Sequence, residues 1–302
     1  MQKTLFILLG PTGVGKTDLS IQLAKEMETE IVSCDSRQFF KEMPIGTAAP
    51  TKEQLSMVKH HFIGNLSIFD YYSCGKFEMD ALACINRLFE TKDAVLMTGG
   101  SMLYIDAVCK GIDDLPDVDQ TLRDQLNARY AQEGIDGIRA ELKILDPEYY
   151  QKVDKKNYKR IIHAVEICLT AGKPYSEIRK ENGKERNFNI VKIGLKRDRD
   201  ELYDRINQRV NIMIQEGLEA EAKALYPHKE RNALNTVGYK EMFTYFDGEW
   251  SLERAIEMIQ QNSRHYAKKQ MSWFNRDQDI TWFHPSQEDE ILAFVKETLR
   301  NQ

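Results

Sequence analysis

Residues Gly10–Thr17 constrain the fold of this chain more than any other part of its sequence. They read Gly-Pro-Thr-Gly-Val-Gly-Lys-Thr and match the pattern G-x-x-x-x-G-K-[ST]. The apolar run Thr4–Leu9 precedes them, and Leu19, Leu23 and Met27 recur every four residues after them. A buried strand, a glycine-rich turn and an amphipathic helix in this order predict a phosphate-binding loop in an α/β protein.

The residues of this loop explain how it would bind phosphate. Glycines let backbone N–H groups converge on phosphate oxygens, and the N-terminus of the following helix adds partial positive charge. Lys16 would supply a mobile charge, and the Thr17 hydroxyl can hold Mg²⁺. The flanking strand and helix disfavour the alternative of a turn that binds nothing, but the pattern does not specify which phosphates bind. The candidate phosphate-binding residues are Gly10, Thr12, Gly13, Val14, Gly15, Lys16 and Thr17.

Short apolar runs elsewhere in the chain predict the rest of the sheet. Their near-continuous apolar character is typical of parallel strands that are covered on both faces, and helical patterns separate them. We therefore expect an α/β fold in which a P-loop NTPase-like parallel sheet is flanked by helices. The five expected strands are Thr4–Leu9, Glu30–Cys34, Ala94–Thr98, Asn189–Leu195 and Asp279–Phe283.

The segment 116–186 has a different character. It is rich in charge and has helical periodicity without any strand pattern. Leu122, Leu126 and Tyr130 share one helix face, and a later apolar stripe ends at Gly172, a good helix stop signal. The pattern predicts an all-helical insertion domain.

This insertion divides the core domain, which we expect to comprise residues 1–115 and 187–302. Two long helices are expected in the second part of the core, roughly Asp200–Tyr226 and Ser251–Phe274. Both lie after the fourth predicted strand.

The bulk composition excludes several classes of protein. No apolar run approaches the roughly 20 residues of a membrane span, and no cleavable signal is recognisable, so we expect a cytoplasmic protein without a membrane partner. The five cysteines form no C-x-x-C pair and predict reduced thiols rather than a zinc site. The net charge of −5 argues against a protein that coats nucleic acid indiscriminately, although a local basic surface remains open. Two adjacent histidines, His60 and His61, are interpreted as structural.

Asp35 follows the second predicted strand. Because ligands of open α/β sheets bind at the carboxyl ends of the strands, Asp35 should face the phosphate-binding loop. A carboxylate there could coordinate Mg²⁺ through water or take a proton from a nucleophile. The alternative is that Asp35 only caps the next helix.

The third predicted strand ends in Thr98-Gly99-Gly100-Ser101. ATPases and GTPases of this class usually carry an aspartate there to orient Mg²⁺ and the attacking water, and this strand has none. The paired glycines would let a ligand approach the backbone, or they would form an ordinary strand-to-helix turn. Ser101 can cap the next helix or donate a hydrogen bond. The missing aspartate weakens the case for an NTPase.

Arg205 and Arg209 lie four residues apart and share a helix face. Arginines that point at a phosphate site can clamp a leaving diphosphate through paired hydrogen bonds. Acidic residues on the same helix allow a second interpretation, a solvated face with salt bridges, and periodicity alone favours it.

The segment Arg264–Arg276 combines basic and aromatic residues without an acid between them. It is the candidate contact for an RNA backbone. Tyr266 and Trp273, seven residues apart, also fit an amphipathic helix whose aromatics face the core, so both interpretations can hold on opposite faces. The basic residues are Arg264, Lys268, Lys269 and Arg276.

Taken together, these motifs resemble those of the bacterial tRNA dimethylallyltransferase (tRNA isopentenyltransferase) family over nearly the whole chain. The order and spacing of the blocks carry the resemblance, since each block alone is weak. The matching blocks are Gly10–Thr17, Asp35–Gln38, Ile45–Ala48, His60–Phe62, Thr98–Tyr104, Asn157–Glu166, Gly172–Pro174, Val237–Glu241 and Tyr266–Gln270.

The resemblance implies an activity and a channel through the core. Dimethylallyl diphosphate would enter one end, and a flipped-out adenosine just 3′ of the anticodon, in tRNAs that read codons beginning with U, would enter the other. Asp35 would be the general base, Lys16 and Thr17 would take part in catalysis, and the loop with Arg205 and Arg209 would hold the diphosphate.

The resemblance also implies Mg²⁺ bound through Thr17 and a protein that we expect to be a monomer. His163 stands where the family usually has arginine, and Ala49 where lysine is common. The residues expected to contact the tRNA anticodon stem-loop are Asp35, Ser36, Arg37, Gln38, Ser101, Arg123, Lys159, Arg160, Ile161, Ile162, His163, Arg264, Lys268 and Lys269.

Three other functions share the same loop. A small-molecule kinase would use ATP there, and a nucleotide-dependent switch would bind ATP or GTP without catalysis, although the chain lacks the guanine-reading N-K-x-D segment. A prenyltransferase acting on free adenylate is the third alternative. The basic aromatic segment and the large insertion favour a macromolecular acceptor over a free nucleotide.

Overall fold

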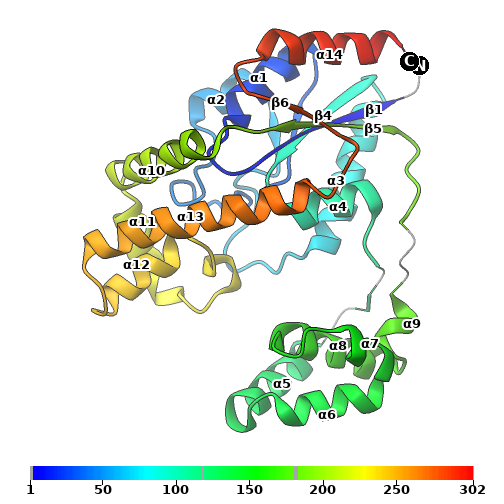
Figure 1. Cartoon of the computed structure of the whole chain (residues 1–302), viewed down its shortest axis with the longest axis vertical. Coiled ribbons are helices and arrows are strands. Elements are labelled where there is room, and N and C mark those ends of the chain that lie inside the picture. The colour runs from blue at the N-terminus through cyan, green and yellow to red at the C-terminus, as the bar shows by residue number, and fades with distance from the viewer. Residues whose placement is uncertain (1–2, 114, 117–118, 180–182, 302) are drawn as a thin grey trace. The chain divides into compact units, whose positions relative to one another are not determined.

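The computed structural model describes residues 3–113, 115–116, 119–179 and 183–301 (Figure 1). The chain forms two compact units. The larger unit comprises Met1–Cys109 and Arg186–Gln302, and the smaller comprises Lys110–Glu185. The domain boundaries expected from the sequence lie between residues 115 and 116 and between residues 186 and 187. They remain predictions.

The larger unit is built on a six-stranded parallel sheet with the strand order β3-β2-β4-β1-β5-β6. The central strand β1 pairs with β4 and β5, so that Thr4 lies opposite Ala94 and Asn189. This confirms the predicted parallel sheet. The strands are β1 (Thr4–Leu9), β2 (Ile31–Ser33), β3 (His60–His61), β4 (Ala94–Gly99), β5 (Asn189–Leu195) and β6 (Ile280–Phe283).

The short edge strand β3 was not among the five predicted strands. It has only two residues, both of them histidines, so it lacks the apolar run by which the other strands are recognised. His61 pairs with the side chain of Glu30, and His60 Nδ1 lies 2.8 Å from the carbonyl oxygen of Val58. Both histidines therefore have structural partners.

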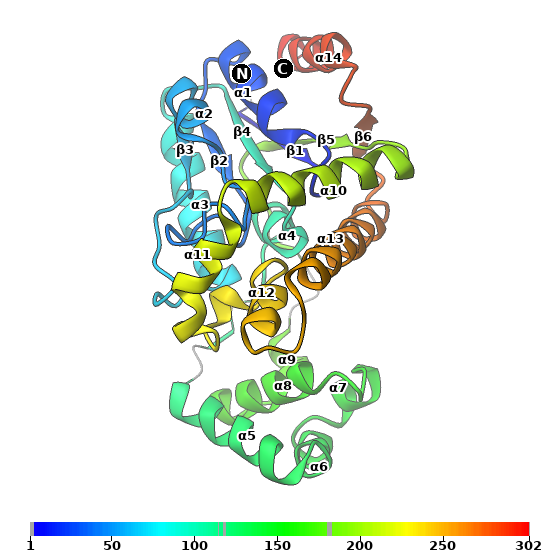
Figure 2. The same ribbon diagram turned by 90° about the vertical axis from the view of Figure 1, so that its left-hand side faces the viewer.

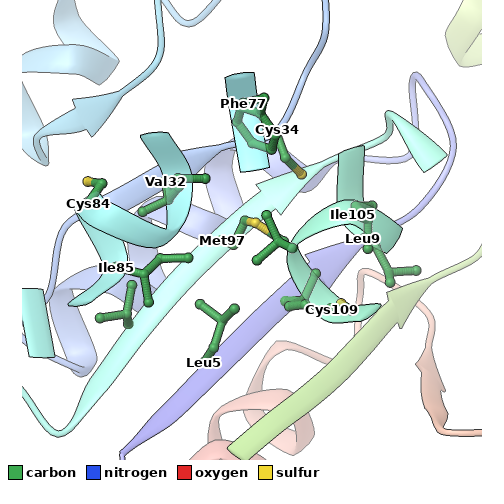
Figure 3. Packing of buried hydrophobic residues seen from close by; sticks show 14 of the residues in the cluster. Leu5, Leu9, Val32, Cys34, Phe77, Cys84, Ile85, Met97, Ile105 and Cys109 are labelled. Carbon is green, nitrogen blue, oxygen red and sulfur yellow. The ribbon is translucent and has the colours of Figure 1, made fainter. Parts of the chain in front are cut away.

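Helices cover both faces of this sheet. Along β1, Leu5, Ile7 and Leu9 face one side and Phe6 and Leu8 the other, and all five are buried. The first side packs under α3 and α4 (Figure 3), and the second under α1 and α14. The helices of this unit are α1 (Lys16–Glu26), α2 (Lys52–Met57), α3 (Cys74–Phe89), α4 (Met102–Lys110), α10 (Arg199–Gln215), α11 (Leu218–Leu225), α12 (Tyr239–Phe246), α13 (Leu252–Phe274) and α14 (Glu288–Arg300).

The long helix predicted at roughly Asp200–Tyr226 is wrong as a single element. It is broken into α10 and α11 at Gly217, whose φ of 104° is left-handed and open to glycine. In contrast, α13 matches the helix predicted at Ser251–Phe274. Ser251 is its N-cap and accepts a hydrogen bond from the N–H of Arg254 at 3.2 Å.

The four helices α10 to α13 enclose a third apolar core beside the sheet. Figures 1 and 2 show α10 and α13 running next to each other, with α11 and α12 at one end of the pair. Val210, Met213, Met242 and Ile259 pack in this core. This core supports one wall of a cavity that α10, α12 and α13 border.

In the described part of the smaller unit every secondary-structure element is a helix, as the sequence predicts. Leu126, Ile138, Leu142, Ile161 and Val165 form its buried core. The predicted stop at the end of its longest apolar stripe is confirmed, because α8 ends at a left-handed glycine with a φ of 64°. The helices are α5 (Gln120–Glu133), α6 (Asp136–Leu145), α7 (Pro147–Lys152), α8 (Tyr158–Ala171) and α9 (Tyr175–Ile178).

All five cysteines are free thiols, and four of them are buried. Among the residues described, no cluster of three or more His, Cys, Asp or Glu side chains could hold a metal ion. In the same part of the chain, every helix is too short or too polar to cross a membrane.

Candidate active site

The glycine-rich loop joins β1 to α1 and wraps around the first turn of the helix. Gly15 precedes α1 with a φ of 109°, and Gly13 has a φ of 80°. A Cβ atom at Gly13 would lie 2.9 Å from Cγ1 of Ile206, so a larger residue would strain the loop and push it off α10. The two glycines thus lead the loop into the N-terminus of α1, where the partial positive charge of the helix favours an anion.

Lys16 is held by the loop itself. Its Nζ donates to the carbonyl oxygens of Gly10 at 2.9 Å and Pro11 at 2.8 Å. Burial and, after it, the charge of Arg209 lower the pKa of Lys16 to about 8, while Asp35 acts in the opposite direction. An anionic ligand would stabilise the charge of a poorly solvated ammonium of this kind.

Arginines from α10 and from the segment before it form hydrogen bonds with the same loop. Arg205 Nε donates to the carbonyl of Gly13 at 3.0 Å, and Arg209 Nη1 donates to Thr12 Oγ1 at 3.3 Å. The interpretation of this helix face as merely solvated is therefore wrong. Arg197, which the sequence did not single out as a site residue, donates to the carbonyl of Val14 at 2.9 Å.

Asp35 follows β2 at the carboxyl end of the sheet, as predicted. Its Oδ1 accepts a hydrogen bond from the N–H of Arg37 at 3.0 Å, which orients the carboxylate within a turn. The next helix starts only at Lys52, so the alternative role of Asp35 as a helix cap is wrong.

The residues around Asp35 are tied to neighbouring elements. Ser101 Oγ accepts from the N–H of Ser36 at 2.8 Å, so its side chain bridges two strand ends. The Arg37 guanidinium donates to the carbonyls of Asn232 and Ala233. These contacts fix the turn that presents Asp35.

Two cavities meet at this aspartate. One, of about 550 Å³, contains the loop, Lys16 and Thr17, and the other, of about 530 Å³, lies against α10, α12 and α13. Burial and the Asp35 charge raise the pKa of Tyr266 to about 12, so its hydroxyl stays protonated beside Asp35. The residues that line both cavities are Thr12, Asp35, Thr47, Arg209 and Tyr266.

Gln270 is a buried site residue that sequence reasoning missed. Its Oε1 accepts from the Thr12 N–H at 2.9 Å, and its Nε2 donates to the carbonyl of Gly100 at 2.8 Å. A Cβ at Gly100 would lie 2.4 Å from Gln270 Nε2, and one at Gly99 would lie 2.5 Å from the Cys34 sulfur. The paired glycines thus make room for protein side chains.

The residues available for Mg²⁺ are few. Thr17, in the first turn of α1, and Asp35 line the same cavity. One hydroxyl and one carboxylate beside a phosphate site fit Mg²⁺, which keeps several waters and binds phosphate oxygens together with one or two protein groups.

The basic helix α13 carries exposed cations along one side. Lys268 and Lys269 are exposed, and with His265, Trp273 and Arg276 they border a groove of about 470 Å³. Arg264 is partly engaged, because it bonds Asn207 and lies over the ring of Tyr203.

The aromatics of α13 take different roles. Phe274 is buried, and Trp273 Nε1 donates to Asp106 at 2.9 Å, as the amphipathic interpretation predicts. Tyr266 instead reaches the two cavities. The aromatic side chains are therefore divided between the core and the cavities, and the RNA contact of the basic residues stays a prediction.

The candidate RNA contacts of the smaller unit divide into two groups. Lys159 and Arg160 are exposed. Ile161 and Ile162 are buried in the core of that unit, so the expectation that their side chains contact tRNA is wrong.

Arg123 and His163 share a buried partner in the smaller unit. Arg123 forms two hydrogen bonds, of 2.9 and 3.1 Å, with the carboxylate of Glu166, and His163 Nδ1 lies 3.4 Å from it. These contacts orient Arg123 and His163 on the unit's own surface.

Comparisons with known proteins agree with this geometry. The model of the IPP transferase family matches residues 38–277. A tRNA dimethylallyltransferase 1 of Phocaeicola vulgatus is 58% identical over 295 residues, with 98% of each chain covered. A tRNA dimethylallyltransferase 1 of Bacteroides fragilis is 56% identical over 298 residues, with 99% of each covered.

Solved structures give the same result. The tRNA isopentenylpyrophosphate transferase of Bacillus halodurans superimposes with a TM-score of 0.71 at 35% identity, over 99% of this chain and 98% of that one. A eukaryotic dimethylallyltransferase acting on tRNA shares the fold, with a TM-score of 0.83 at 24% identity over 99% of this chain and 80% of that one. This chain belongs to the IPP transferase family, in which the tRNA dimethylallyltransferases fall.

Proposed function

We propose that this chain transfers a dimethylallyl group from dimethylallyl diphosphate to the exocyclic amine of the adenosine 3′ of the anticodon, in tRNAs that read codons beginning with U. The observation that carries the proposal is the position of Asp35, where the cavity of the phosphate-binding loop meets a second cavity. A donor bound on one side and a base bound on the other would meet at its carboxylate.

The loop cavity is the proposed donor site. The loop and Lys16 would bind the diphosphate, and Arg205 and Arg209, which bond the loop from α10, would contact it as well. These groups stabilise charge that grows on the diphosphate as it leaves. Mg²⁺, held through the Thr17 hydroxyl, would neutralise part of the same charge when bound.

The second cavity is the proposed acceptor site. A single-stranded loop releases a base at little cost, and polar side chains such as Asn235, Thr236 and Asn262 line the cavity that receives it. Ser36 and Arg37 line it next to Asp35, and Gln38 and Ser101 are further proposed tRNA contacts beside them.

The RNA backbone would lie along the basic face of α13. Lys268 and Lys269 are the exposed cations there, and Arg264 is a weaker candidate because it is partly engaged. In the smaller unit, Arg123, Lys159, Arg160 and His163 remain proposed contacts.

In the proposed reaction the amine nitrogen attacks the primary allylic carbon. The bond from that carbon to the diphosphate oxygen breaks, a carbon–nitrogen bond forms, and Asp35 takes the proton that the amine loses. Diphosphate leaves with the electron pair. We further propose that the enzyme acts as a monomer in the cytoplasm, where its tRNA substrate is found.

Turnover tests this function. Purified protein with Mg²⁺, dimethylallyl diphosphate and an unmodified anticodon stem-loop should yield prenylated adenosine and free diphosphate without ATP, measured by mass spectrometry of the nucleosides. Lys16→Ala should weaken donor binding and slow the reaction. A strict requirement for ATP, or rapid ATP hydrolysis, would identify a kinase instead, and equally fast prenylation of AMP would overturn the RNA acceptor.

A further inference from the structure

A loop formed by residues 43–49 touches both cavities. Gly46 and Thr47 line the second cavity, and Thr47 also lines the donor cavity. The carbonyl of Thr47 accepts from Gln38 Nε2 at 3.1 Å and from Arg209 Nη2 at 3.5 Å. The loop therefore anchors two side chains that border the cavities on either side of Asp35.

A single carboxylate on α11, that of Glu221, accepts hydrogen bonds from the backbone of this loop. Glu221 Oε2 accepts from the N–H of Ile45 at 2.9 Å, and Oε1 accepts from the N–H of Gly46 at 2.8 Å. The hydroxyl of Tyr239 donates to the same Oε1 at 2.6 Å. Charge-assisted hydrogen bonds of this kind are short and strong, and here three of them converge on one group.

Tyr239 also fixes the position of the loop formed by residues 43–49. Its side chain is fully buried, and a Cβ at Gly46 would lie 2.5 Å from its ring. Burial and the Glu221 charge raise the pKa of Tyr239, so its hydroxyl remains a donor. The loop thus packs against the Tyr239 ring and is hydrogen-bonded to the Glu221 carboxylate.

We infer that Glu221 is a positioning residue for prenyl transfer: by clamping residues 45 and 46 it fixes the Thr47 carbonyl, and with it Gln38 and Arg209 beside Asp35. The inference deepens the proposed function and rests on it. Glu221 lines neither cavity, so it acts through the loop and not on the reactants.

The same two helices offer a matched control. Glu219, also on α11, accepts a hydrogen bond from Tyr245 on α12 at 3.3 Å. This second glutamate–tyrosine pair has no bond to residues 43–49. Glu219→Gln therefore removes a similar surface contact without releasing the loop.

The experiment compares Glu221→Gln with Glu219→Gln. Glutamine keeps the size of the side chain but replaces one acceptor oxygen by an NH₂ donor, so Ile45 and Gly46 lose one of the two oxygens that accept from them. Hydrogen exchange at these two amides and steady-state kinetics with dimethylallyl diphosphate and the stem-loop are measured on the full chain.

We expect Glu221→Gln to lose at least about tenfold protection at one or both of these amides and about 10–10² in kcat, since small misplacements of reacting groups cost that much. The KM for the stem-loop should change by less than about threefold, and Glu219→Gln should match the wild type. Glu221→Asp, whose shorter side chain keeps the charge, should recover part of kcat.

Two results would overturn the inference: protection that survives in Glu221→Gln, or protection that is lost while kcat stays normal. If Glu221→Gln does not fold, Tyr239→Phe must lower kcat in the same direction, and an unchanged kcat there contradicts the clamp. A wild-type protein that makes no prenylated product would instead refute the proposed function, and the inference would fall with it.

Discussion

The side chain of Gln270 accepts a hydrogen bond from the backbone N–H of Thr12 at 2.9 Å, although the two residues lie 258 positions apart. This bond attaches α13 to the phosphate-binding loop, and the bond from Gln270 to Gly100 attaches it to the turn after β4. The same helix carries Lys268 and Lys269 on its outer face. The proposed RNA contact and the donor site therefore share one rigid element.

Replacing Gln270 with leucine should destabilise the protein. The change leaves the buried carbonyl of Gly100 and the part-buried N–H of Thr12 without these partners, which costs about 1–3 kcal/mol. Chemical denaturation of the purified variant measures it. Gln260→Leu is the control, because Gln260 lies on the same helix and only bonds half-exposed groups near α10. Equal stabilities of the two variants would show that the hydrogen bond between Gln270 and Thr12 does not stabilise the fold.

The pH dependence of donor use should report Lys16, whose pKa is lowered to about 8 in the free protein. A diphosphate binds the ammonium form, so kcat/KM for the donor should be level below about pH 8 and fall about tenfold per unit above it. Lys16→Ala should remove this descending limb as well as lowering the rate. A limb that persists unchanged in Lys16→Ala would assign it to another group.

Neutralising Lys268 and Lys269 together should weaken binding of the stem-loop and flatten its salt dependence. Each phosphate contact on a single strand contributes about 0.7 to the slope, so the slope should change by about 1–2 units. Donor affinity should stay the same. Lys25 and Lys296, exposed lysines on α1 and α14, form the matched double variant. An identical salt slope in both double variants would place the RNA surface elsewhere.

The parts of the fold that depend on local pattern could be predicted from the sequence. The loop Gly10–Thr17 and its flanking strand and helix follow from glycine spacing and apolar periodicity, and so does α13. The break at Gly217 could have been recognised from its glycine, but the apolar pattern continues across it and suggested one helix.

Contacts between elements that lie far apart in the chain could not be predicted from the sequence. Periodicity placed Arg205 and Arg209 on one face but could not tell whether that face meets solvent or the loop. Gln270 reads as one more polar residue, and only the crossing of α13 over the loop buries it. Ile161 was assigned to RNA because a whole matching block was carried over, although its apolar spacing already indicated a core position.

The central claim is that Asp35, between the two cavities, takes the proton as the prenyl group moves, and single-turnover measurement of Asp35→Asn tests it most directly. We predict that prenylated adenosine forms about 10²–10⁴ times more slowly than with the wild type, the usual scale for loss of a general base. Stem-loop affinity should stay within a few-fold, and Asp70→Asn, which alters only an exposed turn, should react normally. Near-normal product formation by Asp35→Asn would contradict the account.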